Sequence, residues 1–245
     1  IPDPDQLAKR EQVESTKILD RNGKLLYELY DEEKRTLVTL DQVPKHAKEA
    51  TVAIEDKNFY NHGGISFTGI LRSVFVNILT ASKSQGGSTI TQQFVRNAVL
   101  TREKTWGRKI KEIVLSLEIE RRYSKDEILR LYLNEIPYGS NAYGIEAAAQ
   151  TFFGKSAADL TLTESAYLAA MPQAPSFYSP FGPNREALDA RADTVLALMA
   201  DQGYITKEQR DTAQEEQVEF RNIGRGIIAP HFVLYVQDLL AQTYG

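Results

Sequence analysis

The feature that most constrains the fold is a series of helix-length apolar patterns that begins after Pro44 and fills most of the chain. Apolar residues recur there at spacings of three and four, which places them on one face of an α-helix. Proline or glycine separates several of these patterns, and both residue types end helices. The patterns therefore predict a mainly α-helical protein. Helices are expected over residues 46–59, 65–80, 90–99, 102–122, 124–134, 145–153, 162–171, 185–202, 206–216 and 229–244.

The first 40 residues have a different pattern. Residues 17–20 and 25–30 have strand-like sequences and flank Asn22-Gly23, a dipeptide typical of tight hairpin turns. A second, weaker strand pattern covers residues 35–40. We therefore expect a short N-terminal β-hairpin before the helical part of the chain.

Composition excludes several classes of site. A chain of 245 residues with 42% hydrophobic and 25% charged residues can bury a substantial core. Its formal net charge of -4 disfavours nucleic acid as a partner, because nucleic-acid-binding domains usually carry a basic excess. Without cysteine there are no disulfides, thiolate nucleophiles or cysteine-based metal sites. The three histidines, His46, His62 and His231, are far apart, so no histidine-rich metal site is expected.

Two glutamates are the candidate catalytic groups. Glu55 is expected near the C-terminal end of its helix, where the helix dipole disfavours a negative charge, so helix stability does not explain it. Glu112 follows Arg108 by four residues on an amphipathic helix, which makes the two side chains neighbours. From the residues alone, a solvated helix-end acid is the default interpretation of Glu55. An ion-pair partner of Arg108 is the corresponding alternative for Glu112.

Basic residues are clustered between the two glutamates. Arginine and lysine meet phosphate oxygens with positive charge, so the cluster could hold a polyanionic leaving group if the fold turns it to one cleft. Its members are Arg72, Arg96, Arg102, Lys104, Arg108 and Lys109.

The most apolar segment covers residues 65–79. At about 1.5 Å per residue in a helix, it is too short to span a bilayer. It is either a buried core helix or an interfacial segment that dips into a membrane. Residues 81–87 are rich in serine, lysine and glycine, and we expect a mobile loop that could act as a lid.

Several polar residues are expected to have structural roles. Asp56 is interpreted as a hydrogen-bond partner rather than a second base, and His62 as a loop anchor. Ser88-Thr89 could cap the helix that begins at Ile90. Asn134 is interpreted as a packing or helix-end residue.

Five motifs occur in an order that is specific to one family. Together they resemble the peptidoglycan glycosyltransferase domain, glycosyltransferase family 51, of class A penicillin-binding proteins and monofunctional transglycosylases. The resemblance covers roughly Val38 to Asn184. The motifs are EDKNFYNHGG at 55–64, GGSTITQQ at 86–93, RKIKE at 108–112, ILRLYLNE at 128–135, and LTE at 162–164 with PQAP at 172–175.

The resemblance implies a mainly α-helical, lysozyme-like head with a smaller membrane-associated jaw. It divides the chain into an N-terminal segment with the hairpin (1–40), the glycosyltransferase domain (41–190) and C-terminal helices (191–245) that lead towards a transpeptidase domain. It implies an inverting enzyme that polymerises lipid II into β-1,4-linked glycan strands and releases undecaprenyl diphosphate. It places the protein at the outer face of the bacterial cytoplasmic membrane, with an anchor beyond this chain.

The resemblance also implies catalytic and substrate-binding roles for individual residues. Glu55 corresponds to the base that accepts the proton of the acceptor sugar 4-hydroxyl, and Glu112 to the glutamate that assists near the donor diphosphate. No cofactor is obligatory, although Mg²⁺ or another divalent cation could help. The implied partners are lipid II, the growing glycan strand, the membrane surface through residues 65–79 and other cell-wall synthesis proteins. The implied substrate-binding residues are Arg72, Ser88, Gln92, Gln93, Arg96, Lys104, Arg108 and Lys109.

Two other functions are compatible with parts of the sequence. A lysozyme-like glycosidase acting on peptidoglycan also uses two carboxylates, but it does not need a basic cluster to break a neutral glycosidic bond. A noncatalytic module that binds saccharide or lipid is the third interpretation.

Overall fold

A computed structural model describes residues 16–23, 25–29, 34–64, 88–99 and 106–221, together with residues 232, 235, 236 and 239. The helix expected over residues 65–80, the loop expected over 81–87 and most of the helix expected over 229–244 lie outside these ranges. Arg72, Arg102 and Lys104 also lie outside them.

The described part of the chain is mainly helical, as predicted. None of its helices is both long and apolar enough to cross a membrane. The α-helices in the described ranges are α2 (Lys45–Glu55), α4 (Ile90–Val99), α5 (Trp106–Arg122), α6 (Lys125–Glu135), α7 (Ile145–Phe153), α8 (Leu162–Ala170), α9 (Arg185–Asp201) and α10 (Lys207–Glu215). Short 3-10 helices are η1 (Leu40–Gln42), η2 (Phe59–Asn61) and η3 (Ala157–Asp159).

The strands form two small sheets. β1 (Thr16–Leu19) and β2 (Leu25–Leu29) pair antiparallel around the Asn22-Gly23 turn, which confirms the predicted hairpin. Gly23 has φ +80°, a conformation that glycine adopts without steric cost. The second sheet has the order β3-β5-β4, from β3 (Lys34–Arg35), β5 (Ala142–Tyr143) and β4 (Pro137–Gly139).

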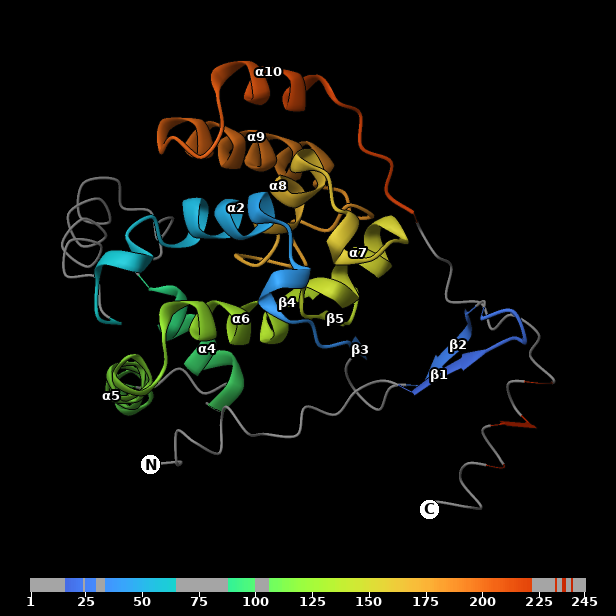
Figure 1. Ribbon diagram of the computed structural model, residues 1–245, viewed down its shortest axis with the longest axis horizontal. Helices are drawn as coiled ribbons and strands as arrows, with labels where there is room; N and C mark the ends of the chain where they lie inside the picture. The colour runs from blue at the N-terminus through green and yellow to red at the C-terminus, as the bar shows by residue number, and fades with distance from the viewer. Residues whose placement is uncertain are drawn as a thin grey trace.

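Helix α2 lies between two groups of helices (Figure 1). It packs against α8 and α9 on one side, while α4 packs against α5 and α6 on the other. Small side chains allow close packing in this core, because Ala47, Ala50 and Ala53 of α2 and Ala147–Ala149 of α7 are buried. The C-terminal end of α2 lies beside the start of α4, which carries the second motif, because Glu55 and Asp56 are hydrogen-bonded to Gln93 and Ile90.

Local capping explains where several helices begin and end. Thr89 and Gln92 exchange hydrogen bonds at the start of α4, so Thr89 is the N-cap of this helix. Ser124 and Glu127 form the predicted capping box of α6. α7 runs from Ile145 to Phe153 as predicted and ends at Gly154, which has a left-handed backbone.

Two predictions about local structure were wrong. α2 ends at Glu55 instead of continuing to Phe59, because Asp56 leaves the helical region with φ -160° and ψ 75°. The strand predicted over residues 35–40 is limited to the two residues of β3. Beyond it, Val38 is hydrogen-bonded at both its N–H and its carbonyl by the side chain of Asn134, and Leu40 begins η1.

Candidate active site

Glu55 is the last residue of α2, and its carboxylate lies in a largely desolvated position. Oε2 accepts a hydrogen bond of 2.6 Å from Nε2 of Gln93 on α4. Oε1 is buried and has no hydrogen-bond partner among the described residues. An acceptor left without a partner in a buried position is energetically costly, and a substrate donor would relieve that cost. We define Glu55, Gln93 and Arg96 as the acid sub-site.

Burial raises the pKa of the Glu55 carboxyl above its ordinary value of 4.5, because the buried position disfavours the charged form. The hydrogen bond from Gln93 lowers the pKa, as do the positive charges of Arg191 and Arg96, while the negative charge of Asp56 raises it. The net direction is upwards. A carboxylate of raised pKa is a stronger base.

Asp56, the next residue, connects three segments. Its carboxylate accepts hydrogen bonds from Nε2 of His62 at 2.8 Å and from the backbone N–H of Ile90 at 3.2 Å. The other nitrogen of His62 accepts from the backbone N–H of Gly64. These contacts agree with the structural roles expected of Asp56 and His62. They fix the end of α2 against the start of α4, which places Glu55 beside Gln93.

Gly64, at the end of the first motif, packs closely against α5. Its φ is +82°, and a Cβ atom there would approach Cγ of Glu120 to 2.9 Å and the carbonyl oxygen of Ser116 to 3.1 Å. Its own carbonyl accepts a 2.7 Å hydrogen bond from the Thr89 hydroxyl. A glycine is therefore required for the loop to lie against α5.

Glu120 belongs to a structural network rather than to the acid sub-site. Its nearly buried carboxylate accepts a hydrogen bond from Thr91 of α4 and forms an ion pair of 2.7 Å with Lys125 at the start of α6. Lys125 also lies 4.5 Å from the centre of the Phe59 ring. The network ties α4, α5 and α6 together beneath the first motif.

Three residues near Glu55 were not predicted to belong to the site. The Tyr132 hydroxyl donates a 3.4 Å hydrogen bond to Oε1 of Gln93. Burial raises the pKa of Tyr132 and Tyr138, and the charge of Glu55 raises both further, so these phenols stay protonated. Arg191 of α9 donates to the Ala170 carbonyl at 2.9 Å and lies 5.2 Å from the centre of the Tyr178 ring. Tyr132 lies in the fourth motif, whereas no local pattern identified Arg191.

Glu112 lies in a separate cluster of charges on α5. Its side chain is 1% exposed, and Lys109 and Arg108 both contact it, the latter at 3.5 Å. Lys109 also donates to the Ser88 hydroxyl at 3.4 Å. We call Ser88, Arg108, Lys109 and Glu112 the cation sub-site. The ion pair of Glu112 with Arg108 that the spacing predicted is therefore present.

Helix α4 connects the two sub-sites. Ser88 precedes the helix and Gln93 lies five residues later, a distance of about 7–8 Å along the axis at 1.5 Å per residue. Gln92, the neighbouring predicted substrate contact, instead binds the Thr89 cap. The structure thus groups Glu55 with Gln93 and Arg96, and Glu112 with Ser88, Arg108 and Lys109, while Arg72 and Lys104 lie outside the described residues.

The acidic and histidine side chains of the described residues can be compared with the needs of a metal site. Within them, no group of three or more His, Cys, Asp or Glu side chains is placed to hold a metal ion. The acidic side chains of the two sub-sites already have basic or amide partners.

Comparison with protein families gives one match, which covers most of the chain. The family described as Transglycosylase matches residues 22–200. This range includes all five motifs and both sub-sites.

Named relatives are similar over nearly the whole chain. Penicillin-binding protein 1A of Aquifex aeolicus is 42% identical over 245 residues, which is 100% of this chain and 34% of the relative. Penicillin-binding protein 1F of Bacillus subtilis is 46% identical over 82% of this chain and 28% of its own length. A crystal structure of penicillin-binding protein 1A from Haemophilus influenzae has a TM-score of 0.53 and 26% identity, and the match covers 96% of this chain and 25% of that protein. The chain thus spans about a third or less of these relatives.

The raised pKa of Glu55 predicts a pH-dependent effect of Glu55→Gln on stability. Above the folded pKa the wild type keeps a buried charge, whereas below 4.5 the carboxyl is protonated in both the folded and the unfolded state. Glu55→Gln should therefore raise the melting temperature by a few degrees at pH 7, and the difference should vanish as the pH falls to about 4. Thermal melts across this range measure it. A variant that is less stable than the wild type at pH 7 would contradict the desolvated position of Glu55.

Proposed function

We propose that this chain, which belongs to the transglycosylase family, is the peptidoglycan glycosyltransferase part of a longer penicillin-binding protein. The substrate is lipid II, and the product is a β-1,4-linked glycan strand with release of undecaprenyl diphosphate. The observation that carries the proposal is a buried glutamate of raised pKa, Glu55, which Gln93 in the first turn of α4 holds, while the cation sub-site contacts Ser88 just before that helix.

Glu55 acts as the general base. The oxygen of the acceptor sugar 4-hydroxyl forms the new bond to the anomeric carbon of the donor, and its proton passes to the Glu55 carboxylate. Oε1 of Glu55 has no hydrogen-bond partner in the described structure, so it can accept that proton without breaking an existing contact. Gln93 holds the other oxygen and thereby fixes the orientation of the carboxylate.

The cation sub-site receives the leaving group. The bond between the anomeric carbon and the diphosphate oxygen breaks, and the electron pair leaves with the diphosphate. Arg108 and Lys109 offset the negative charge that builds on those oxygens. Glu112 acts through them as a positioning residue, because a buried carboxylate held between two cations keeps them in place. Arg72, Ser88, Gln92, Arg96 and Lys104 complete the proposed set of substrate-binding residues.

Membrane location forms a further part of the proposal. We propose that residues 65–79 contact the outer face of the bacterial cytoplasmic membrane, since their apolar composition suits an interface and the substrate is a lipid. Flotation with liposomes compares the wild type with Phe75→Glu, and equal flotation of both would count against this contact. No step is assigned to a divalent cation, and other cell-wall synthesis proteins are proposed as partners of the longer protein.

The glycosidase alternative is less well supported by the site. Two-carboxylate hydrolysis needs a second carboxyl group that activates water or attacks the sugar. Glu112 is 1% exposed and bound by two basic side chains, so it is poorly placed for either role. A hydrolase would release reducing ends from finished peptidoglycan without any use of lipid II.

Replacing Glu55 by Gln tests the proposed function directly. The amide keeps the shape and the contact with Gln93 but cannot accept the proton, so glycan formation from labelled lipid II should fall by at least about 100-fold. Gel analysis of the products measures this loss, and Glu118→Gln, which changes an exposed ion pair with Arg121, is the matched control. Polymerisation by Glu55→Gln at close to the wild-type rate would exclude Glu55 as the base.

A further inference from the structure

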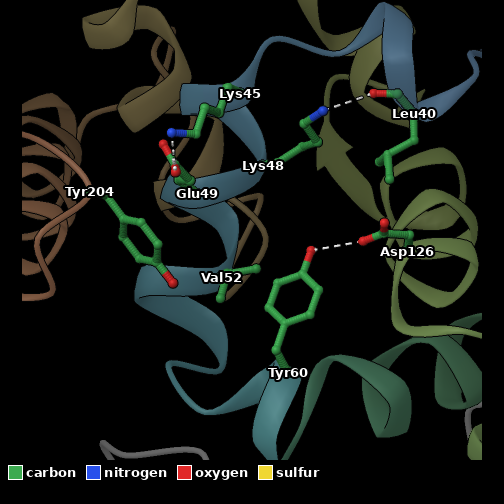
Figure 2. Close-up of a pocket in the computed structure, with 8 residues that line it drawn as sticks. All are labelled: Leu40, Lys45, Lys48, Glu49, Val52, Tyr60, Asp126 and Tyr204. Carbon is green, nitrogen blue, oxygen red and sulfur yellow. Dashed lines mark hydrogen bonds and ion pairs between the residues drawn. The ribbon is translucent and has the colours of Figure 1, made fainter.

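A pocket of about 260 Å³ lies beside α2, on a part of the molecule that neither sub-site uses (Figure 2). It is bounded by α2, η1, η2, the start of α6 and the turn after α9. Its volume is slightly below the range of about 300–1,000 Å³ that is typical of sites for drug-sized ligands, which suits a ligand of about one ring. The residues that line it are Leu40, Lys45, Lys48, Glu49, Val52, Tyr60, Asp126 and Tyr204.

The floor and walls of the pocket are apolar and aromatic. Val52 is buried at the floor, and the rings of Tyr60 and Tyr204 lie on either side of it in the view of Figure 2. Tyr60 is 52% exposed, so its ring is accessible from solvent. A ligand that enters would place one flat, weakly polar face against these rings.

The charges at the rim are balanced. Lys45 pairs with Glu49 at 3.4 Å, and Lys48 donates to the carbonyl of Leu40 at 3.1 Å. The Tyr60 hydroxyl donates to Asp126 at 3.1 Å, and burial together with this contact raises the pKa of Tyr60 to about 12. Two lysines thus face two acids, a balance that favours neither a phosphate nor a metal cation and suits a neutral ligand.

The rim nevertheless offers hydrogen bonds. The carboxylates of Glu49 and Asp126 have lone pairs beyond those that Lys45 and Tyr60 use. The Tyr204 hydroxyl makes no hydrogen bond to the part of the chain that the structure describes. Burial raises the pKa of Tyr204, and the negative charge of Glu49 raises it further. A purely apolar occupant would cover these groups without satisfying them, at about 1–3 kcal/mol for each group left without a partner.

We propose that this pocket binds a single neutral pyranose ring of a saccharide. Ring hydroxyls donate to the carboxylates of Glu49 and Asp126, and the C–H face of the sugar packs on Tyr204 and Tyr60. The inference rests on the proposed function for its source of ligand, because a glycan strand is the saccharide that this enzyme would handle. Binding in the pocket requires no turnover, so the two proposals can fail separately.

The test measures binding of a β-1,4-linked trimer of N-acetylglucosamine to the whole chain by saturation-transfer NMR and calorimetry. Tyr204→Ala removes a wall of the pocket and should weaken binding about tenfold, whereas Tyr204→Phe should retain most of the affinity. Asp126→Ala, which changes an exposed side chain, should also weaken binding, and a thermal melt checks that this variant is folded. Lys207→Ala, an exposed change outside the pocket, is the matched control.

Glu55→Gln separates this pocket from the acid sub-site. It should bind the trimer as the wild type does, and Tyr204→Ala should still polymerise lipid II. The proposal is overturned if the wild type does not bind the trimer at millimolar concentration, or if Tyr204→Ala and Asp126→Ala both bind normally. Loss of binding in Glu55→Gln would assign the saccharide to the acid sub-site instead. Binding of phenol without binding of the trimer would identify an aromatic pocket and would also contradict the proposal.

Discussion

The arrangement of the acid sub-site depends on the hydrogen bonds that the Asp56 carboxylate accepts. One side chain joins the end of α2, the imidazole of His62 and the first turn of α4. Because Asp56 is almost buried, loss of either donor would leave its desolvated carboxylate with one partner in place of two, which is costly. Glu55 is the preceding residue, so the contact that ends the helix also fixes the position of the proposed base. Two adjacent acids with different partners therefore fix the end of α2 and the position of the proposed base.

The two adjacent acids differ because their surroundings differ. Asp56 meets a ring nitrogen and a backbone amide, whereas Glu55 has one amide donor and one oxygen without a hydrogen-bond partner among the described residues. Burial then raises the pKa of Glu55, and Arg96 and Arg191 limit the rise. Glu112 is a third case, a buried carboxylate held between two cations. In the proposed mechanism, these environments suit Glu55 to proton transfer, Asp56 to the fold and Glu112 to holding positive charge.

The sequence predicts best what local chemistry decides. The bounds of α4 and α7 follow from the Thr89 cap and from Gly154, which act within a few residues of the helix ends. The end of α2 was predicted four residues too late, because its termination depends on Ile90, which is 34 residues beyond Asp56. The strand predicted before Leu40 is replaced by contacts with Asn134, which is 96 residues beyond Val38. Such partners leave no periodic signal in the segment that they alter.

The same distinction applies to the site. Glu55, Gln93 and the Arg108–Glu112 pair were predicted because they lie in ordered motifs or at helical spacing. Arg191 was missed because it comes from α9 and reaches the region of Glu55 only through the packing of α2 against that helix. The pocket beside α2 was also not predictable, since its two tyrosines are 144 residues apart and their proximity depends on the completed fold.

The most direct test of the central claim is the pH dependence of kcat/KM for glycan formation from lipid II. If buried Glu55 is the base, the acid limb should lie above the ordinary glutamate value of 4.5. Gln93→Ala should move that limb to still higher pH, because the hydrogen bond from Gln93 lowers the pKa of Glu55. Titration of the lipid diphosphate is common to both enzymes, so the difference between the two profiles reports the protein group. An acid limb at or below 4.5, or one that Gln93→Ala leaves in place, would contradict the account.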